Sequence, residues 1–372
     1  MQSASVLSLQ APKDVSLSQV ELELSKIWQS YGENAAARAT TFNLLVYEPE
    51  NEIGTRLVTV DTIANQTPCR VIDLCPISGE DEGIMAQVAA YCPIQKSSSS
   101  LICGEYITLR GTREAFDRIH TLLTGLVISD LPTFVWWKDS PAPYTRMFER
   151  LVNLSDRLIF DSAFFKDSET DLLKVQELIN NHAQIADLNW RRIAPWQELT
   201  AQAFDSPDRR AGAWKVDRVT IDYEKGNSTQ ALMFLGWLAS RLEWKPVSLS
   251  KEGGDYNIQR ITLISRDNFE VEVELAAIPV GDVGDVVGDM MGLKLSSTDP
   301  TADTSNVFCS ESMGCMRMEA GAQSSRTYQV TRLSDQSANI LLSQQLQRWG
   351  REVLYEESLA VAAEILKLNS AN

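Results

Sequence analysis

The stretch that decides the fold is residues 132–160, "PTFVWWKDSPAPYTRMFERLVNLSDRLIF". The runs "PTFVWWKD" (132–139) and "RLIFDSAF" (157–164) are typical of buried strands, and "PYTRMFERLVNL" between them is helix-like. Similar strand-like and helix-like runs alternate before this stretch, from residue 41 onward. This alternation predicts an α/β layered structure with a largely parallel or mixed sheet and flanking helices.

The length of 372 residues favours two domains. Aromatic, helix-like sequence gives way to charged turn residues at 205–210, which places the predicted boundary there. We therefore expect an N-terminal α/β domain at 1–205 and a C-terminal α/β domain at 206–372. The second half offers strand-like runs around an apolar helix, "STQALMFLGWLASRLEW", which predicts a mixed sheet with helices.

The regular pattern is lost between residues 281 and 325, where Gly, Ser, Thr and Asp are frequent. We expect a long, acidic, flexible loop here, because connections of this length inside a domain are usually functional or disordered. The loop contains "NVFCSESMGC", residues 306–315, with Cys309 and Cys315 close in the chain.

The net charge is -16, from 50 acidic and 34 basic residues. A chain this acidic repels phosphate backbones and anionic lipids, so neither nucleic acid nor membrane is expected as a partner. The N-terminal residues lack the basic and apolar regions of a signal peptide, and no run is long enough to span a bilayer. The expected location is the cytoplasm.

Four other cysteines lie in or beside apolar runs: Cys69, Cys75, Cys92 and Cys103. We expect them to be structural, and in a reducing compartment most cysteines behave as buried small hydrophobic residues. Cys69 and Cys75 flank the strand-like run "RVIDL", which would hold them about 20 Å apart, too far for a disulfide. This pair is expected to stay reduced.

The sequence contains none of the common catalytic, cofactor or metal motifs. It has no G-x-G-x-x-G, P-loop, G-x-S-x-G or H-E-x-x-H, and no C-x-x-C pair, so we expect no cofactor and no metal. The two histidines, His120 and His182, are far apart and are interpreted as structural. Acidic residues do lie near the ends of predicted strands, where α/β proteins form sites: Asp61, Asp73, Asp130, Asp139 and Asp161. A carboxylate-based hydrolase or a sugar-phosphate-binding protein is therefore the alternative hypothesis.

Trp136 and Trp137 are adjacent in a predicted strand, so their side chains point to opposite faces of the sheet. At least one should be buried under helices. The other either packs beneath the opposite layer or lines an interface, where Trp is enriched. Both are kept as candidates for a partner interface.

Three segments carry a family resemblance: "DLPTFVWWKDSP", "TPCRVIDL" and "DLNWRRIAPWQELTAQAFD". Together they resemble the OpcA family, known as glucose-6-phosphate dehydrogenase assembly proteins. The resemblance implies a protein that is not an enzyme. It implies that the chain binds glucose-6-phosphate dehydrogenase and activates it allosterically, controlling entry to the oxidative pentose phosphate pathway.

The resemblance also implies a role for the two cysteines of the 281–325 segment. Cyanobacterial members of the family are associated with thioredoxin-linked redox control, and "CSESMGC" matches their pattern. It implies a Cys309–Cys315 disulfide that thioredoxin reduces, with the oxidised form activating. Gly314 and the neighbouring serines would let the chain turn back between them. Two unpaired thiols, and a general chaperone of dehydrogenase assembly, remain open alternatives.

Overall fold

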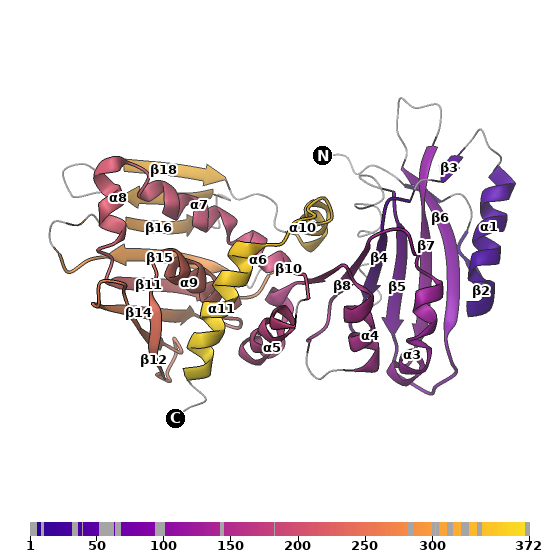
Figure 1. The fold of residues 1–372 in the computed structure, drawn as a ribbon, viewed down its shortest axis with the longest axis horizontal. Helices are drawn as coiled ribbons and strands as arrows, with labels where there is room; N and C mark the ends of the chain where they lie inside the picture. The colour runs from indigo at the N-terminus through magenta and orange to yellow at the C-terminus, as the bar shows by residue number, and fades with distance from the viewer. Residues whose placement is uncertain are drawn as a thin grey trace. The chain divides into compact units, whose positions relative to one another are not determined.

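The computed structural model describes most of the chain and divides it into two compact units (Figure 1). The described residues are 6–8, 11–31, 36–38, 40–51, 63, 68–93, 101–141, 145–181, 183–281, 286–299, 302, 305–310, 315–320, 327–332 and 337–368. The first unit comprises Met1–Phe160, Ala183–Ala186 and Ala338–Gly350, and the second comprises Asp161–His182, Asp187–Ser337 and Arg351–Asn372. The predicted α/β class is confirmed.

A ten-stranded mixed sheet forms the centre of the first unit (Figure 1). Its strands are β1 Val6–Ser8, β2 Lys13–Val15, β3 Ala36–Arg38, β4 Asn43–Tyr47, β5 Arg70–Pro76, β6 Met85–Pro93, β7 Leu101–Gly111, β8 Thr133–Trp137, β9 Arg157–Phe160 and β10 Ile185–Asp187. The main path runs β1-β6-β7-β5-β4-β8-β9-β10, while β2 pairs with β6 and β3 with β7. Strand β6 is antiparallel to its neighbours, and β7, β5, β4, β8 and β9 are parallel.

The winding direction of this sheet reverses between β4 and β8. From β4 the chain proceeds outward through β5 to β7, and then it returns to β8 and proceeds the other way through β9 to β10. This is the strand order of the doubly wound dinucleotide-binding fold, in which ligands bind beside the carboxyl ends of the two strands that flank the reversal. The carboxyl ends of β4 and β8 are therefore the first place to look for a site.

Helices cover the sheet of the first unit. They are η1 Leu17–Gln19, α1 Val20–Tyr31, α3 Arg113–Ile119, η2 Leu122–Gly125, α4 Arg146–Leu154 and α10 Ala338–Gln345. Helix α1 packs beside β6 and α4 packs on β8. Every residue of β4, β5, β8 and β9 is buried, as expected for parallel strands with layers on both faces. The strand–helix–strand prediction for 132–160 is thus confirmed as β8, α4 and β9.

The second unit is built on an eight-stranded sheet of order β12-β13-β14-β11-β15-β16-β17-β18 (Figure 1). Its strands are β11 Arg218–Glu224, β12 Lys245–Lys251, β13 Gln259–Ile264, β14 Glu270–Ile278, β15 Met290–Ser296, β16 Ser305–Ser310, β17 Cys315–Ala320 and β18 Thr327–Arg332. Among the described strands of this sheet, only β11 and β14 pair in parallel, and the other pairs are antiparallel. Buried and exposed residues alternate along β13 and β14, so one sheet face meets the core and the other meets solvent.

The core face of this sheet is covered by helices. The helical segments of the unit are η3 Ser162–Phe164, α5 Ser168–Asn180, α6 Leu188–Arg192, α7 Ala194–Ala203, α8 Pro207–Ala213, α9 Thr229–Arg241 and α11 Val353–Leu368. Helix α9 is apolar and almost wholly buried, and it packs against α11. No helix in the described part of the chain is long and apolar enough to cross a bilayer.

The division between the units differs from the boundary predicted near residue 205. The first unit ends at Phe160, and its sheet is completed by the short segment 183–186. The charged residues at 207–213 form helix α8 instead of a linker. Pro207 stands in its first turn, where a missing N–H costs nothing.

The segment 281–325 is not the structureless loop that its composition predicts. It contains β15, β16 and β17, which extend the sheet beyond β11. The sequence misleads because these strands carry few of the β-branched and aromatic residues that mark strands. The short alternating run in "CMRMEA" is a strand signal, but it is hidden among the many Gly, Ser, Thr and Asp residues of the segment.

Candidate functional site

The carboxyl ends of β4 and β8 are filled by side chains of the protein itself. Tyr47 and Trp137 are register partners, and their rings stack at 4.0 Å between centroids with 10° between planes. Phe148 of α4 packs edge-on against Trp137 at 4.6 Å. Burial raises the pKa of Tyr47 to about 12, so its hydroxyl stays neutral. Aromatic side chains therefore fill the position at which a doubly wound fold binds its ligand.

Charged pairs close the same edge just beyond this stack. Lys138 follows β8 and forms an ion pair with Glu48, which follows β4. Arg113 reaches Asp139 at 3.0 Å and Glu50 at 3.2 Å. The sequence after β4 begins Glu-Pro-Glu, which supplies neither the glycines nor the free N–H groups of a pyrophosphate cradle. The described residues at this edge are thus unsuited to a dinucleotide.

Both interface candidates, Trp136 and Trp137, are buried, with 2% and 3% of their surface exposed. Trp137 donates its indole N–H to the Ser140 carbonyl at 3.1 Å. The Lys138 ammonium lies 5.0 Å from the centre of the Trp136 ring, a cation–π contact. In this conformation the two tryptophans belong to the core and present no surface to a partner.

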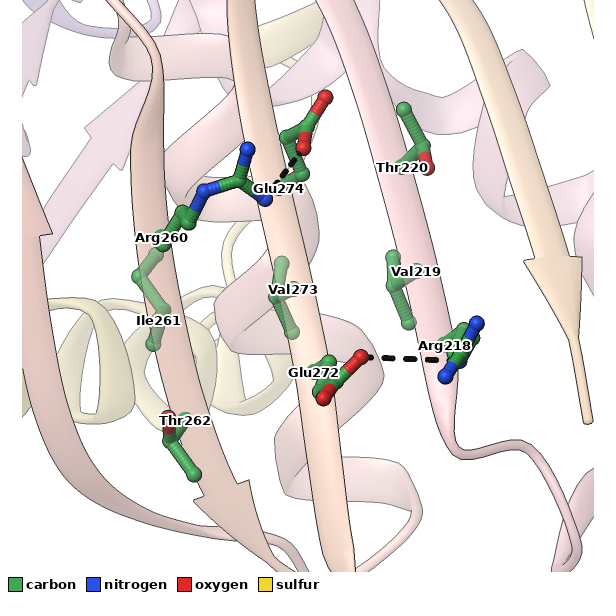
Figure 2. A pocket seen from close by; sticks show the side chains of 9 residues that line it. All are labelled: Arg218, Val219, Thr220, Arg260, Ile261, Thr262, Glu272, Val273 and Glu274. Carbon is green, nitrogen blue, oxygen red and sulfur yellow. Dashed lines mark hydrogen bonds and ion pairs between the residues drawn. The ribbon is translucent and has the colours of Figure 1, made fainter. Parts of the chain in front are cut away.

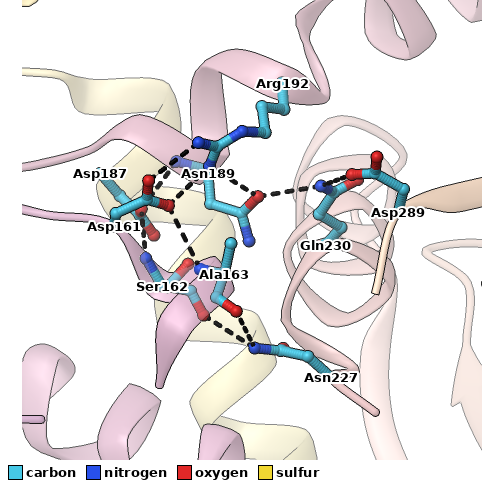
Figure 3. A network of polar contacts seen from close by, with 9 residues as sticks. All are labelled: Asp161, Ser162, Ala163, Asp187, Asn189, Arg192, Asn227, Gln230 and Asp289. Carbon is cyan, nitrogen blue, oxygen red and sulfur yellow. Dashed lines mark hydrogen bonds and ion pairs between the residues drawn. The ribbon is translucent and has the colours of Figure 1, made fainter. Parts of the chain in front are cut away.

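A buried network of polar side chains lies in the second unit and begins just after β9 (Figure 3). Arg192, at the end of α6, donates to both carboxylate oxygens of Asp161, at 2.5 and 2.8 Å. Asp187 caps α6, and its Oδ1 accepts from the backbone N–H groups of Asn189 and Ser162 at 2.9 and 3.0 Å. The network therefore ties η3 to α6 through one paired charge and one helix cap.

Helix α9 and strand β15 join the same network. The Gln230 amide donates to Asn189 at 2.9 Å and to Asp289 at 2.6 Å, and it accepts from the Met290 N–H at 3.1 Å. Asn227 donates to the carbonyls of Ser162 and Ala163, at 2.9 and 3.0 Å (Figure 3). Most side-chain groups of this network are thus used in hydrogen bonds that join η3, α6, α9 and β15. Such an arrangement indicates a structural role.

Asp187 is the most perturbed acid of the network. Burial, helped by the charge of nearby Asp161, raises the pKa of Asp187 to about 7 against the hydrogen bonds from Ser162 and Asn189. Its second oxygen, Oδ2, is buried without a hydrogen-bond partner. The unfolded chain releases this proton near pH 4, so between about pH 4 and 7 the folded state binds more protons.

Stability should consequently fall as pH rises through that window and level off above it. We expect Asp187→Asn to flatten this dependence, because an amide keeps the Oδ1 acceptor and cannot ionise. The measurement is the melting temperature of wild type and variant between pH 5 and 8.5. Asp130→Asn, a change at an exposed turn, is the control, and an unchanged pH profile in Asp187→Asn would contradict the assignment.

A shallow groove of about 400 Å³ lies on the solvent face of the second sheet (Figure 2). Arg260 pairs with Glu274 at 2.6 Å and with Glu252 at 2.8 Å, and Arg218 lies 3.5 Å from Glu272. Each guanidinium thus already faces a carboxylate, which would compete with an incoming phosphate. Rows of both charges suit contact with a protein surface better than recognition of a small anion.

The predicted strand-end carboxylates do not form one acidic site. Asp61 lies outside the described residues. Asp73 lies within β5 and accepts from the Tyr106 hydroxyl at 3.0 Å, whereas Asp130 is exposed on a turn. Asp139 pairs with Arg113, and Asp161 with Arg192. Among the described residues, no group of three or more His, Cys, Asp or Glu is arranged to hold a metal.

The histidine and cysteine predictions have mixed outcomes. His120 caps the end of α3 beside the Asp117 carbonyl, and His182 lies outside the described residues. Cys69 and Cys75 are buried thiols, as expected, and burial raises the pKa of Cys69 to about 12. Cys103 is buried, as expected, and it is disulfide-bonded.

Cys309 lies in β16 and Cys315 is the first residue of β17, so the pair sits in neighbouring antiparallel strands. Cys309 stands opposite Met316, and Cys315 stands opposite Ser310. The two positions are therefore one step apart along the ladder. Their side chains lie outside the described residues.

Sequence reasoning missed Arg192, Asn189 and Gln230 as members of one buried network. Local sequence does hold one signal, because an Asp directly before a helix-like run is a typical N-cap. Asp187 fits this pattern and its cap is observed. The partners of the cap come from elements far along the chain, so no local pattern identifies them.

Two family models match consecutive parts of the chain. Residues 60–177 match the glucose-6-phosphate dehydrogenase subunit N-terminal domain, and residues 183–359 match the C-terminal domain of the same subunit. The boundary between the models falls at 177–183, within the region where the chain passes between the two units.

Curated relatives match along nearly their whole length. A protein of Nostoc punctiforme described as OxPP cycle protein OpcA is 49% identical, with 99% of this chain and 97% of the relative covered. Its namesake from Synechocystis sp. is 43% identical, with 100% and 95% covered. A third, from Synechococcus elongatus, is 42% identical, with 97% and 98% covered.

Solved structures give only a distant likeness. UDP-N-acetylglucosamine 3-dehydrogenase GnnA from Acidithiobacillus ferrooxidans is 11% identical, with a TM-score of 0.45 over 89% of this chain and 98% of that one. An NAD binding oxidoreductase from Klebsiella pneumoniae is 7% identical, with a TM-score of 0.48 over 90% and 98%. A likeness at this level says nothing of activity.

Proposed function

Because this chain belongs to the OpcA family of glucose-6-phosphate dehydrogenase assembly proteins, we propose that it binds glucose-6-phosphate dehydrogenase and activates it allosterically. The observation that carries the proposal is the match of both subunit domains together with relatives aligned over nearly the whole chain. The partner is then an enzyme, and this chain has no catalytic step of its own.

The filled edge of the first sheet supports a role without catalysis. Tyr47, Trp137 and the Lys138–Glu48 pair occupy the position where a doubly wound enzyme would hold its nucleotide. Asp161, which directly follows β9, is paired with Arg192. The described groups therefore favour a binding protein over a dehydrogenase or a carboxylate-based hydrolase.

Activation requires that this protein bind the active state of the dehydrogenase more tightly than the inactive state. An allosteric partner must remain bound for its effect to last. A chaperone of assembly would instead leave a lasting effect after its removal. This difference separates the proposed function from the chaperone alternative.

The proposal includes redox control through Cys309 and Cys315. A thioredoxin-type dithiol would reduce the disulfide by exchange, forming two thiols on this chain while its own two thiols become a disulfide. The oxidised form is the activating one. Support comes from the resemblance of "CSESMGC" to the cyanobacterial pattern of the family and from the position of both cysteines in adjacent strands.

The ladder suggests how oxidation would be transmitted. Cys309 pairs with Met316 in the described register, so bringing Cys309 opposite Cys315 needs a shift of one residue between β16 and β17. A one-residue change of register reverses which face each side chain occupies. Disulfide formation would thereby alter the face of β17 and its pairing with β18.

The test is the initial rate of the cognate dehydrogenase against glucose-6-phosphate, with and without this protein, after oxidation or reduction of this protein alone. We expect the oxidised form to lower the Michaelis constant or raise the maximal rate, and reduction to diminish the effect. Replacing both Cys309 and Cys315 with Ser should abolish the difference between the two forms. Ser310→Ala, in the same strand, should retain it.

Two outcomes would overturn parts of the proposal. If neither form changes the dehydrogenase, the proposed partner is wrong; if the double Ser variant still responds to thioredoxin, the cysteine assignment is wrong. Turnover of a sugar phosphate by the isolated protein, lost in Asp130→Asn or Asp161→Asn, would favour the enzyme alternative.

A further inference from the structure

We infer that Cys103 is bonded to Cys92, and that this cross-strand disulfide is a second thiol–disulfide site, in the first unit. Cys103 is disulfide-bonded, while Cys69 and Cys75 are thiols. The pairing of β6 with β7 identifies the partner. The inference is independent of the proposed function.

Strands β6 and β7 are antiparallel neighbours over a continuous register from Met85 opposite Arg110 to Tyr91 opposite Gly104. One further step places residue 92 opposite residue 103, and both residues lie within the bounds of their strands. Directly opposed residues in such a ladder have Cα atoms about 4.5–5.5 Å apart. A disulfide spans about 4.4–6.8 Å between Cα atoms, so this pairing needs no movement of the backbone.

The location of the bond predicts slow exchange. Cys103 is fully buried, and β7 is paired at this residue on its other side too, with Arg38 of β3 opposite Cys103. A Cβ at the adjacent Gly104 would lie 2.6 Å from the carbonyl oxygen of Cys69, the residue before β5, so this backbone also approaches closely. A reductant can reach the Cys103 sulfur only when these strands open.

The bond closes residues 92–103 into a ring and fastens β6, with its partners β1 and β2, to the parallel part of the sheet. In its formation, each thiol loses one proton and one electron to an oxidised dithiol, which becomes two thiols as the sulfur–sulfur bond forms. The first unit would then gain stability on oxidation independently of the cysteines in the second unit.

Differential alkylation tests the pairing. Thiols of the oxidised protein are blocked in denaturant, the protein is reduced, and newly freed thiols receive a heavy label before tryptic mapping. We expect the heavy label on Cys92 and Cys103 and the light label on Cys69. Without reduction, the tryptic peptides 71–96 and 97–110 should remain linked, with the bond at Cys92 and not at Cys75.

Two variants sharpen the result. Cys92→Ser should release Cys103 to the first label, whereas Cys75→Ser should leave the crosslink intact. Labelling in denaturant makes both readouts independent of whether a variant folds. A Cys103 that is alkylated before reduction in the wild type, or that stays bonded in Cys92→Ser, would overturn the inference.

The rate at which a dithiol reduces the disulfide tests whether the bond is buried. In wild type, a dithiol reductant should cleave this bond at least about tenfold more slowly under native conditions than in denaturant, because the strands must first open. Equal rates would contradict a bond enclosed between β6 and β7. Neither the labelling result nor the rate of reduction depends on the effect of this protein on glucose-6-phosphate dehydrogenase, which is tested by the separate rate assay.

Discussion

Replacing Arg192 with methionine should destabilise the second unit by about 3–5 kcal/mol, because it leaves the buried carboxylate of Asp161 without its counter-charge. Arg192 and Asp161 are 1% and 4% exposed at their side chains, so water cannot take the place of the guanidinium. The nearby Asp187 makes the site less tolerant of a second uncompensated negative charge. Calorimetric unfolding should show the loss as a lower transition temperature.

A double variant separates the ion pair from simple packing. Asp161→Asn with Arg192→Met removes both charges, so it should be less destabilised than the sum of the two single variants. Arg241→Met, which removes an exposed pair with Glu357, is the matched control and should change stability by less than about 1 kcal/mol. Additive losses at Asp161 and Arg192 would contradict a coupled pair.

Gly236→Ala should also be strongly destabilising, although alanine is the better helix former. A Cβ at Gly236 would lie 2.1 Å from the backbone oxygen of Ser358, so α9 and α11 must move apart. The gain in helix propensity is at most about 1 kcal/mol. Overpacking against a backbone atom costs about 3 kcal/mol or more, and the net effect should be a clear fall in melting temperature.

The contact between α9 and α11 also involves a hydrogen bond, from the Ser358 hydroxyl to the Met233 carbonyl at 2.5 Å. Gly125→Ala provides the control, because a Cβ there meets nothing within 4 Å. That change should be neutral or slightly stabilising. A Gly236→Ala protein with wild-type stability would show that the two helices can separate without loss of packing.

The parts of the fold that local sequence dictates could be predicted. Residues 132–160 contain a complete strand, helix and strand, each with its own periodicity, and all three are observed. The order of the strands could not be predicted, because it depends on pairing between distant segments. The helix at 207–213 was missed because its charged residues and proline are equally typical of a turn.

The candidate sites also depend on contacts between distant segments, which the sequence does not predict. The Asp161–Arg192 pair joins residues 31 positions apart, and the register of β6 with β7 decides the partner of Cys103. Neither the ion pair nor the strand register can be predicted from a short window of sequence. Burial of both tryptophans likewise depends on α4 and on β4, since Phe148 and Tyr47 supply the rings that pack around Trp137.

The aromatic core at the end of β4 and β8 has a consequence for what this scaffold can become. Opening a nucleotide site there would require removal of Tyr47, Trp137 and the Lys138–Glu48 pair together, and each removal alone takes away buried contacts before any ligand can bind. Truncating a single large core side chain costs about 3–5 kcal/mol, much of a domain's net stability. A stepwise route to a nucleotide site in this fold thus passes through intermediates that lose core packing before they gain a ligand.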